Sequence, residues 1–289
     1  AAQRFALQDW TGARDGFAAA LATLPAGADA ARRARLDLMI ALSDAALKSW
    51  AAAADGFERA GAGLPLLSDH IGYQAARARY FAHQGDRALA LARAVAADST
   101  SGADAELLAG DILRGRDDHA ATAAQYRTYL ADRPEGIRLS EARFRLAEAL
   151  EHQGEHGDEV IQLYRRITIA DPLSAWAPQA QARLDALLAA LPAADRARYT
   201  TLSAEELVER GTVYFDNMRN PLSEADFGAA LTAPGGTDAL RCTAAYQYAQ
   251  SFFKARNRTD AAPAFDAALP LCRAAGDVHQ ERRRRAELH

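Results

Sequence analysis

Aromatic residues recur along the chain at a fixed distance before a proline, within stretches that are otherwise rich in alanine. The four clearest pairs, each eight positions apart, are Phe17 and Pro25, Phe57 and Pro65, Tyr126 and Pro134, and Tyr164 and Pro172. The positions four before and three after each aromatic are mostly small or apolar: Ala13, Ala20, Ala53, Ala60, Thr122, Tyr129, Val160 and Ile167. Because positions three and four apart share one face of a helix, this ladder predicts a buried helical stripe. The proline predicts the end of each helix, since it cannot continue one.

The ladder repeats at an interval typical of stacked helix pairs. Two weaker copies surround Phe227 and Phe265, with Pro234 one position early and Arg273 in place of the last proline. Successive aromatics such as Phe17 and Phe57 are 40 residues apart, somewhat more than the roughly 34 residues of an ideal tetratricopeptide (TPR) unit. The sequence therefore predicts an all-α chain, an α-solenoid of TPR-like helix-turn-helix repeats that forms a superhelix or arc.

The first helices of several repeats can also be predicted. They are expected over residues 73–85, 141–154 and 242–257, with Gly85 and Gly154 just past the ends of the first two. A connector around Pro192 suggests two segments of one continuous solenoid, 1–192 and 193–289. Both chain ends fall inside predicted repeats, so we expect the sequence to be part of a longer protein.

Charge and hydropathy exclude several classes of partner. The formal net charge is −4, which gives no general electrostatic basis for binding nucleic acid. The arginines at 282–285 are expected on the solvated face of a helix rather than in a nucleic-acid patch. No apolar run approaches the roughly 18 residues that a membrane span needs.

The only two cysteines occupy matched positions in the last repeat. Cys242 falls at the start of the first helix and Cys272 near the end of the second, and antiparallel helices place these positions at the same level. We therefore expect a disulfide, which would indicate an oxidising compartment such as a periplasm. The alternative is a pair of buried small side chains.

Polar clusters in the sequence favour structural roles over catalysis. His152 and His156 are four residues apart, but glycines interrupt the stretch, so a solvated loop is expected rather than a metal site. Ser203 and Glu206 fit a helix capping box. The three tryptophans, Trp10, Trp50 and Trp176, are expected at helix starts in packing roles, with sugar stacking as the alternative. We predict no catalytic residue, no metal and no cofactor within this chain.

First helices line the concave face of a solenoid, which is where a partner would bind. In the repeat frame, the positions expected to be exposed there are Glu141, Phe144, Glu148, Glu151 and His152, followed in the last repeat by Thr243, Tyr246, Gln250 and Lys254. We predict that Phe144, Glu148, Glu151, Tyr246, Gln250 and Lys254 form the binding surface. The alternative is ordinary solvated surface with the aromatics in the core.

Two parts of the sequence resemble a family of bacterial cell-wall proteins. Residues 164–187, YRRITIADPLSAWAPQAQARLDAL, are similar to the helical superstructure of soluble lytic transglycosylases. Residues 202–231 and 240–272 resemble the repeats that precede the catalytic domain in transglycosylases of the delta-proteobacterial type. The matching positions are Leu240, Arg241, Cys242, Ala245, Tyr246, Arg256, Arg258, Ala262, Pro263, Ala264 and Cys272.

The resemblance, which covers residues from about 70 to 289, implies a role in the cell wall. Members of this family cleave the glycan of peptidoglycan with a C-terminal lysozyme-like domain, in which a glutamate acts as acid and base. This chain has no matching catalytic segment, so it would be the non-catalytic periplasmic scaffold and would contact glycan strands or envelope proteins. The alternative is a TPR adaptor of the bacterial cell envelope that binds other proteins. A stand-alone enzyme is disfavoured, since no acid and base groups converge.

Overall fold

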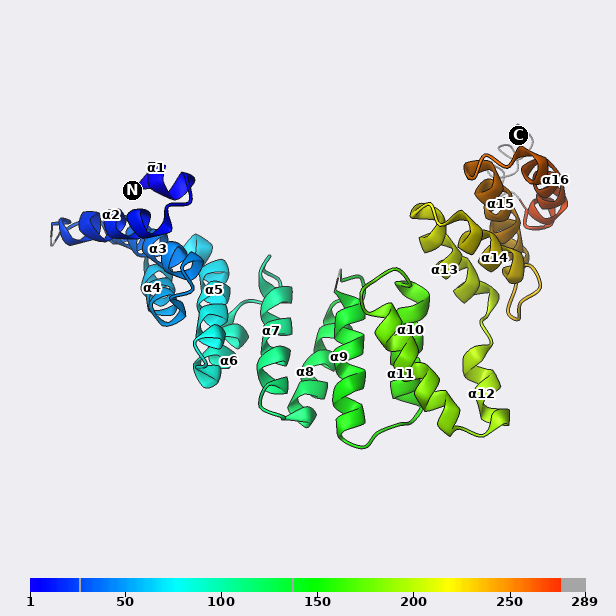
Figure 1. Cartoon of the computed structure of the whole chain (residues 1–289), viewed down its shortest axis with the longest axis horizontal. Helices are drawn as coiled ribbons and strands as arrows, with labels where there is room; N and C mark the ends of the chain where they lie inside the picture. Colours follow the sequence, from blue (N-terminus) through cyan, green and yellow to red (C-terminus); the bar gives the residue numbers. More distant parts are fainter. Residues whose placement is uncertain (26, 137, 277–289) are drawn as a thin grey trace. The chain divides into compact units, whose positions relative to one another are not determined.

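The computed structural model describes residues 1–25, 27–136 and 138–276, and the regular secondary structure in these ranges is helical (Figure 1). The predicted all-α class is therefore confirmed. The chain forms two compact units, of which the first ends at Gly136. The arginine run at 282–285 lies outside the described residues.

The described residues of the first unit form four helix pairs. Its elements are α1 (Ala2–Ala6), α2 (Trp10–Ala22), α3 (Ala30–Ala46), α4 (Trp50–Gly63), the 3₁₀ helix η1 (Pro65–Leu67), α5 (Ser68–Phe81), α6 (Gly85–Ala94), α7 (Gly102–Arg114) and α8 (His119–Asp132). From α1 to α8, each α-helix packs against the next α-helix along the chain, which is the arrangement of TPR-like helix-turn-helix repeats.

The described part of the second unit contains three helix pairs and two additional helices. Its elements are α9 (Leu139–His152), α10 (Asp158–Ala170), α11 (Ala177–Ala190), α12 (Ala193–Thr200), α13 (Ala204–Asp216), α14 (Asn220–Ala230), α15 (Asp238–Lys254) and α16 (Arg258–Ala274). The boundary predicted at residue 192 falls between α11 and α12, inside this unit. It stays a prediction.

One turn geometry joins the two helices of every pair. A residue with positive φ follows the first helix in each turn: Gln8, Lys48, His83, Asp117, Gly154, Met218 and Arg256. In the second turn, the Lys48 amide donates to the Ala45 carbonyl (3.0 Å) and the Ser49 amide to the Asp44 carbonyl (2.8 Å). The same two bonds recur in the other six turns, and they satisfy carbonyls that a helix end leaves unpaired.

These turns define the repeat and correct one expectation. Neighbouring turn positions are 34 to 40 residues apart, except between Gly154 and Met218, where α11 and α12 intervene. Gly154 does lie just past the end of α9, as predicted. The expectation for Gly85 is wrong, because Gly85 is the first residue of α6 and His83 takes the left-handed position.

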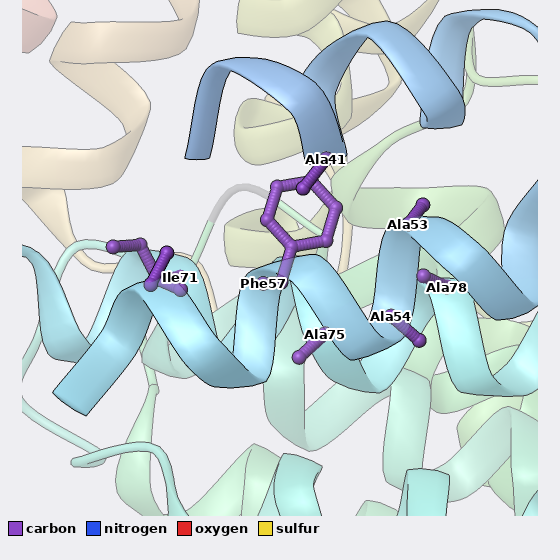
Figure 2. Packing of buried hydrophobic residues seen from close by; sticks show 8 residues of the cluster. Ala41, Ala53, Ala54, Phe57, Ile71, Ala75 and Ala78 are labelled. Carbon is purple, nitrogen blue, oxygen red and sulfur yellow. The ribbon is translucent and has the colours of Figure 1, made fainter. Parts of the chain in front are cut away.

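The aromatic ladder forms the core between helices. All six aromatics are buried: Phe17, Phe57, Tyr126, Tyr164, Phe227 and Phe265. In Figure 2 the ring of Phe57 on α4 points at Ala41 of α3, with alanines of α4 and α5 around it. A methyl group added at Gly56 would lie 2.8 Å from the Ala41 side chain, so this close approach requires glycine. Ala20 departs from the ladder, because it is exposed.

The prolines of the four clear pairs act as predicted. Helices α2, α4, α8 and α10 each end two or three residues before their proline. In α16 the residue at the corresponding position is Arg273, and the helix continues to Ala274 with Pro263 and Pro270 inside it. The stop therefore depends on the position of the proline relative to the aromatic and not on proline content alone.

A buried arginine joins α10 to the end of α12 and the start of α13. The Nε of Arg165 donates to the Tyr199 carbonyl (2.7 Å), and its Nη2 donates to the Thr201 carbonyl (3.0 Å) and to Glu206 (2.8 Å). Glu206 also completes the predicted capping box with Ser203 at the start of α13. One side chain thus fixes α10, the end of α12 and the start of α13 together.

Candidate functional site: a groove between α9 and α11

A groove of about 680 Å³ runs between α9 and α11 in the second unit. Both helices pack on α10, so they stand where the first helices of neighbouring repeats would stand. Its lining residues are Phe144, Arg145, Glu148, Trp176, Gln179, Ala182, Arg183 and Ala186. Their spacing of three or four within each helix places them on one helix face. Two of the predicted binding residues, Phe144 and Glu148, are therefore in this groove.

The aromatic side of the groove is held in place by ring contacts. The centroid of the Phe144 ring lies 5.4 Å from that of Tyr164 and 5.1 Å from that of Trp176. Phe144 is buried, which corrects the expectation that its ring is exposed. Trp176, the residue before α11, is half-buried and presents the more accessible aromatic surface.

Arg145 is the central polar group of the groove. Its guanidinium carbon lies 4.8 Å from the centre of the Trp176 ring, and its Nη1 donates to Glu148 (3.0 Å). Its Nε is buried and has no hydrogen-bond partner in the described part of the chain. A buried donor without an acceptor costs about 1–3 kcal/mol.

Glu151 lies one helical turn from Glu148 and already has partners within the unit. It accepts a hydrogen bond from the Tyr164 hydroxyl, and its Oε2 is 3.8 Å from the Nε of Arg183. Burial and this bond to Glu151 raise the pKa of Tyr164 far above its usual value, so the hydroxyl remains a donor. Glu151 thus pairs with Arg183, an exposed residue of the groove lining.

The other three predicted binding residues lie on α15 and are engaged within the unit. Tyr246 is buried, with its ring centroid 5.9 Å from that of Phe265, so the expectation that it is exposed is wrong. Gln250 donates to the Tyr246 hydroxyl (2.9 Å). Lys254 donates to the Phe215 carbonyl (2.7 Å) and lies 3.7 Å from the centre of the Phe215 ring. A binding role for all six predicted residues stays a prediction.

Several groove residues were not among those predicted to bind. Gln179 and Arg183 belong to α11, and Trp176 directly precedes it. This helix lies between the clear repeats and has no aromatic–proline ladder of its own. The signal that could have found them is the spacing of Gln179, Ala182, Arg183 and Ala186 after Trp176, on one face of a predicted helix.

The predicted disulfide is present between Cys242 and Cys272. The S–S distance is 2.07 Å, and both residues are buried between α15 and α16. Among the described residues, no group of three or more His, Cys, Asp or Glu side chains could hold a metal ion. No helix in the described ranges is both long enough and apolar enough to span a membrane.

Comparisons with known proteins find structural similarity at low sequence identity. No protein-family model matches the sequence, and no curated protein shows significant similarity to it. The structure is similar to that of a tetratricopeptide repeat protein from Parabacteroides merdae, at 13% identity and a TM-score of 0.46, over 88% of this chain and 98% of that one. It also matches the apo quorum sensor NprR from B. thuringiensis, at 12% identity and a TM-score of 0.27, over 94% of this chain and 62% of that one.

The class of the protein follows from the repeated helix pairs of the chain itself. Seven pairs within the described residues share one turn, and buried aromatics fill the spaces between their helices. The chain is thus an α-solenoid of TPR-like repeats, an architecture that suits contact with other proteins.

Proposed function

We propose that this chain is a binding scaffold that holds a peptide segment of a partner protein in the groove between α9 and α11. The observation that carries the proposal is that one groove brings the half-buried ring of Trp176 together with the charged side chains of Arg145, Arg183 and Glu148. A peptide supplies both an acceptor carbonyl and apolar side chains for such a surface.

The lining of the groove supports a peptide over a small apolar ligand. Two cations, Arg145 and Arg183, stand beside one anion, Glu148, and an amide, Gln179. Groups of both signs next to an aromatic surface can pair with backbone groups and with side chains of either charge.

The test is selection of random displayed peptides on the whole chain, followed by measurement of Kd for the enriched sequences by calorimetry. We expect micromolar binding that is lost on Ala182→Trp, because the indole would fill the groove. We also expect at least a tenfold weakening on Arg183→Glu. Binding that survives Ala182→Trp unchanged would place the peptide elsewhere and overturn the proposal.

A matched control is available on the same helix. Gln181 is exposed on α11 and does not line the groove. Gln181→Trp adds the same ring to the same helix, so it is expected to leave Kd within twofold of the unmodified chain. If Gln181→Trp weakened binding as much as Ala182→Trp, the loss would reflect damage to α11 rather than a filled groove.

A finer candidate function is the helical scaffold of a periplasmic peptidoglycan lytic transglycosylase. The observation that favours it is that the disulfide joins Cys242 and Cys272, the two cysteines within the segments that resemble that family. A structural disulfide also supports an oxidising location such as the cell envelope. Co-sedimentation with purified sacculi tests this candidate. Retention of the chain on sacculi that soluble glycan fragments reverse would favour the transglycosylase scaffold. No retention would favour the adaptor that binds other proteins.

A further inference from the structure

A second groove, of about 420 Å³, lies between α2 and α3 in the first unit. Its apolar lining includes Leu24, Leu36 and Met39, which are half-buried. Arg32 and Arg35 line the same groove, and both side chains are exposed. No acidic residue is part of this lining, which distinguishes it from the groove between α9 and α11.

The two arginines have no ion-pair partner among the described residues. The acids on and just before α3 are engaged elsewhere. Asp37 pairs with Arg59 (3.0 Å), and Asp44 lies 4.0 Å from Arg14. Asp29, which precedes α3, accepts a hydrogen bond from the Ala31 amide (3.2 Å). The positive charge of Arg32 and Arg35 therefore remains available at the surface.

The position of Arg32 in the helix adds to this positive field. Arg32 is in the first turn of α3, where the helix dipole already places partial positive charge and where no acidic residue is found. Cations in a first turn oppose the dipole and cost stability, by roughly 0.3–1 kcal/mol each. A local arrangement that costs stability, beside a groove, is the expected mark of a binding surface.

We propose that the groove between α2 and α3 binds an acidic, amphipathic segment of a partner protein. Carboxylates of that segment pair with Arg32 and Arg35, and its apolar side chains pack on Leu36, Met39 and Leu24. The spacing fits a continuous stripe, because residues 32, 35, 36 and 39 share one face of α3. A protein segment is favoured over nucleic acid, because most of this lining is apolar and the whole chain has a net charge of −4.

The test uses the whole chain and a fluorescein-labelled peptide in which Glu and Leu form two stripes of one helix. Anisotropy should report binding that weakens at least tenfold when Gln replaces Glu in the peptide. The double variant Arg32→Glu, Arg35→Glu should bind the Glu/Leu peptide at least tenfold more weakly. It should bind a peptide with Lys in place of Glu more tightly than the Glu/Leu peptide. Because both arginines are exposed, the helical circular dichroism should not change.

Arg33 provides the matched control. It is exposed on α3, roughly 100° around the helix from Arg32, and does not line the groove. Arg33→Glu changes net charge as much as Arg35→Glu, so the proposal requires a loss below twofold for Arg33→Glu and about fivefold or more for Arg35→Glu. Equal losses would mean a general field effect and would overturn the docking site.

Other occupants of the groove are distinguishable outcomes. Tighter binding of a short DNA duplex, or of vesicles with anionic lipid, would overturn the proposal in favour of those ligands. Self-association by light scattering that Arg32→Glu with Arg35→Glu abolishes would make the partner a second copy. The Ala182→Trp variant should still bind the acidic peptide fully, which separates this surface from the proposed function of the other groove.

Discussion

Arg165 connects helices of the second unit in a way that the repeat pattern does not predict. It is 8% exposed, and its guanidinium donates to two backbone carbonyls and to Glu206. These partners belong to the end of α12, the residues that follow it, and α13. A planar group with five donors can make all four of these hydrogen bonds at once, whereas a lysine has only three donors.

We expect Arg165→Met to destabilise the second unit by about 2–4 kcal/mol, because it leaves two carbonyls and one carboxylate without donors. Chemical denaturation followed by Trp176 fluorescence would measure the change. Adding Glu206→Gln to Arg165→Met should restore part of the loss, since the unpaired charge is removed. A loss below 0.5 kcal/mol for Arg165→Met would show that the joint is solvated and contributes little.

The ion pair between Arg165 and Glu206 predicts that the stability of the second unit depends on pH. The hydrogen bond from Arg165 lowers the pKa of Glu206 below its usual value of 4.5. A carboxyl whose folded pKa is depressed adds stability above its unfolded pKa, and this contribution is lost as the pH falls through the folded pKa. The stability difference between the natural chain and Glu206→Gln should therefore be constant from pH 6 to 8 and shrink below pH 4.5. A difference that stayed constant down to pH 3 would contradict it.

The candidate site was predicted in part at this scale. Phe144 and Glu148 line the groove, but the predicted exposure of Phe144 and Tyr246 is wrong. Sequence spacing fixes which helix face a residue occupies within about one position, and a ring at the edge of that face packs inward when another ring is near. Trp176 and Phe265 are those rings here, and neither contact can be read from local spacing.

At the scale of elements, the turn between paired helices is more constant than the helices themselves. Six of the seven turns place a residue other than glycine at positive φ, at values between 57° and 60°. This conformation costs L-residues roughly 1–2 kcal/mol. The two backbone bonds of each turn offset that cost, so glycine is not required, and Gly85 misled the prediction for this reason.

The free-energy cost of a positive φ can be tested by placing glycine in one turn and removing it from another. Met218 has φ of 58° and an exposed side chain, so Met218→Gly should stabilise the chain by about 0.5–1 kcal/mol. Gly154 has φ of 83° and open space where a Cβ would lie, so Gly154→Ala should destabilise by about 1 kcal/mol through the backbone alone. Thermal unfolding would measure both changes. Destabilisation by Met218→Gly would show that the methionine side chain makes contacts that outweigh the strain.

Second helices were predicted better than first helices. The segments around Tyr126 and Tyr164 predict α8 and α10 well, because each combines an aromatic residue, small or apolar neighbours at helical spacing and a proline after the helix. First helices lack the proline, and α5 begins at Ser68 rather than near residue 73. The η1 turn before α5 explains the difference, since Pro65 starts it and the chain re-enters a helix at once.

At the scale of the whole molecule, the division into two units separates the disulfide from the groove between α2 and α3. Cys242 and Cys272 belong to the second unit, whereas Arg32 and Arg35 belong to the first. The tryptophans divide in the same way, with Trp10 and Trp50 before residue 136 and Trp176 after it. Tryptophan fluorescence can therefore report each unit separately once the other tryptophans are replaced by phenylalanine.

Reduction of the disulfide should act on one unit. Its closed loop corresponds to about 3–4 kcal/mol in the chain-entropy model, so dithiothreitol should lower the denaturation midpoint reported by Trp176. The midpoint reported by Trp50 should stay where it is if the units unfold separately, and the acidic peptide should still bind at the α2–α3 groove. Equal shifts at both tryptophans would show that the chain unfolds as one cooperative body. Two free thiols per denatured, non-reduced chain would instead show that Cys242 and Cys272 are not bonded, and the case for an oxidising compartment would then lose its main support.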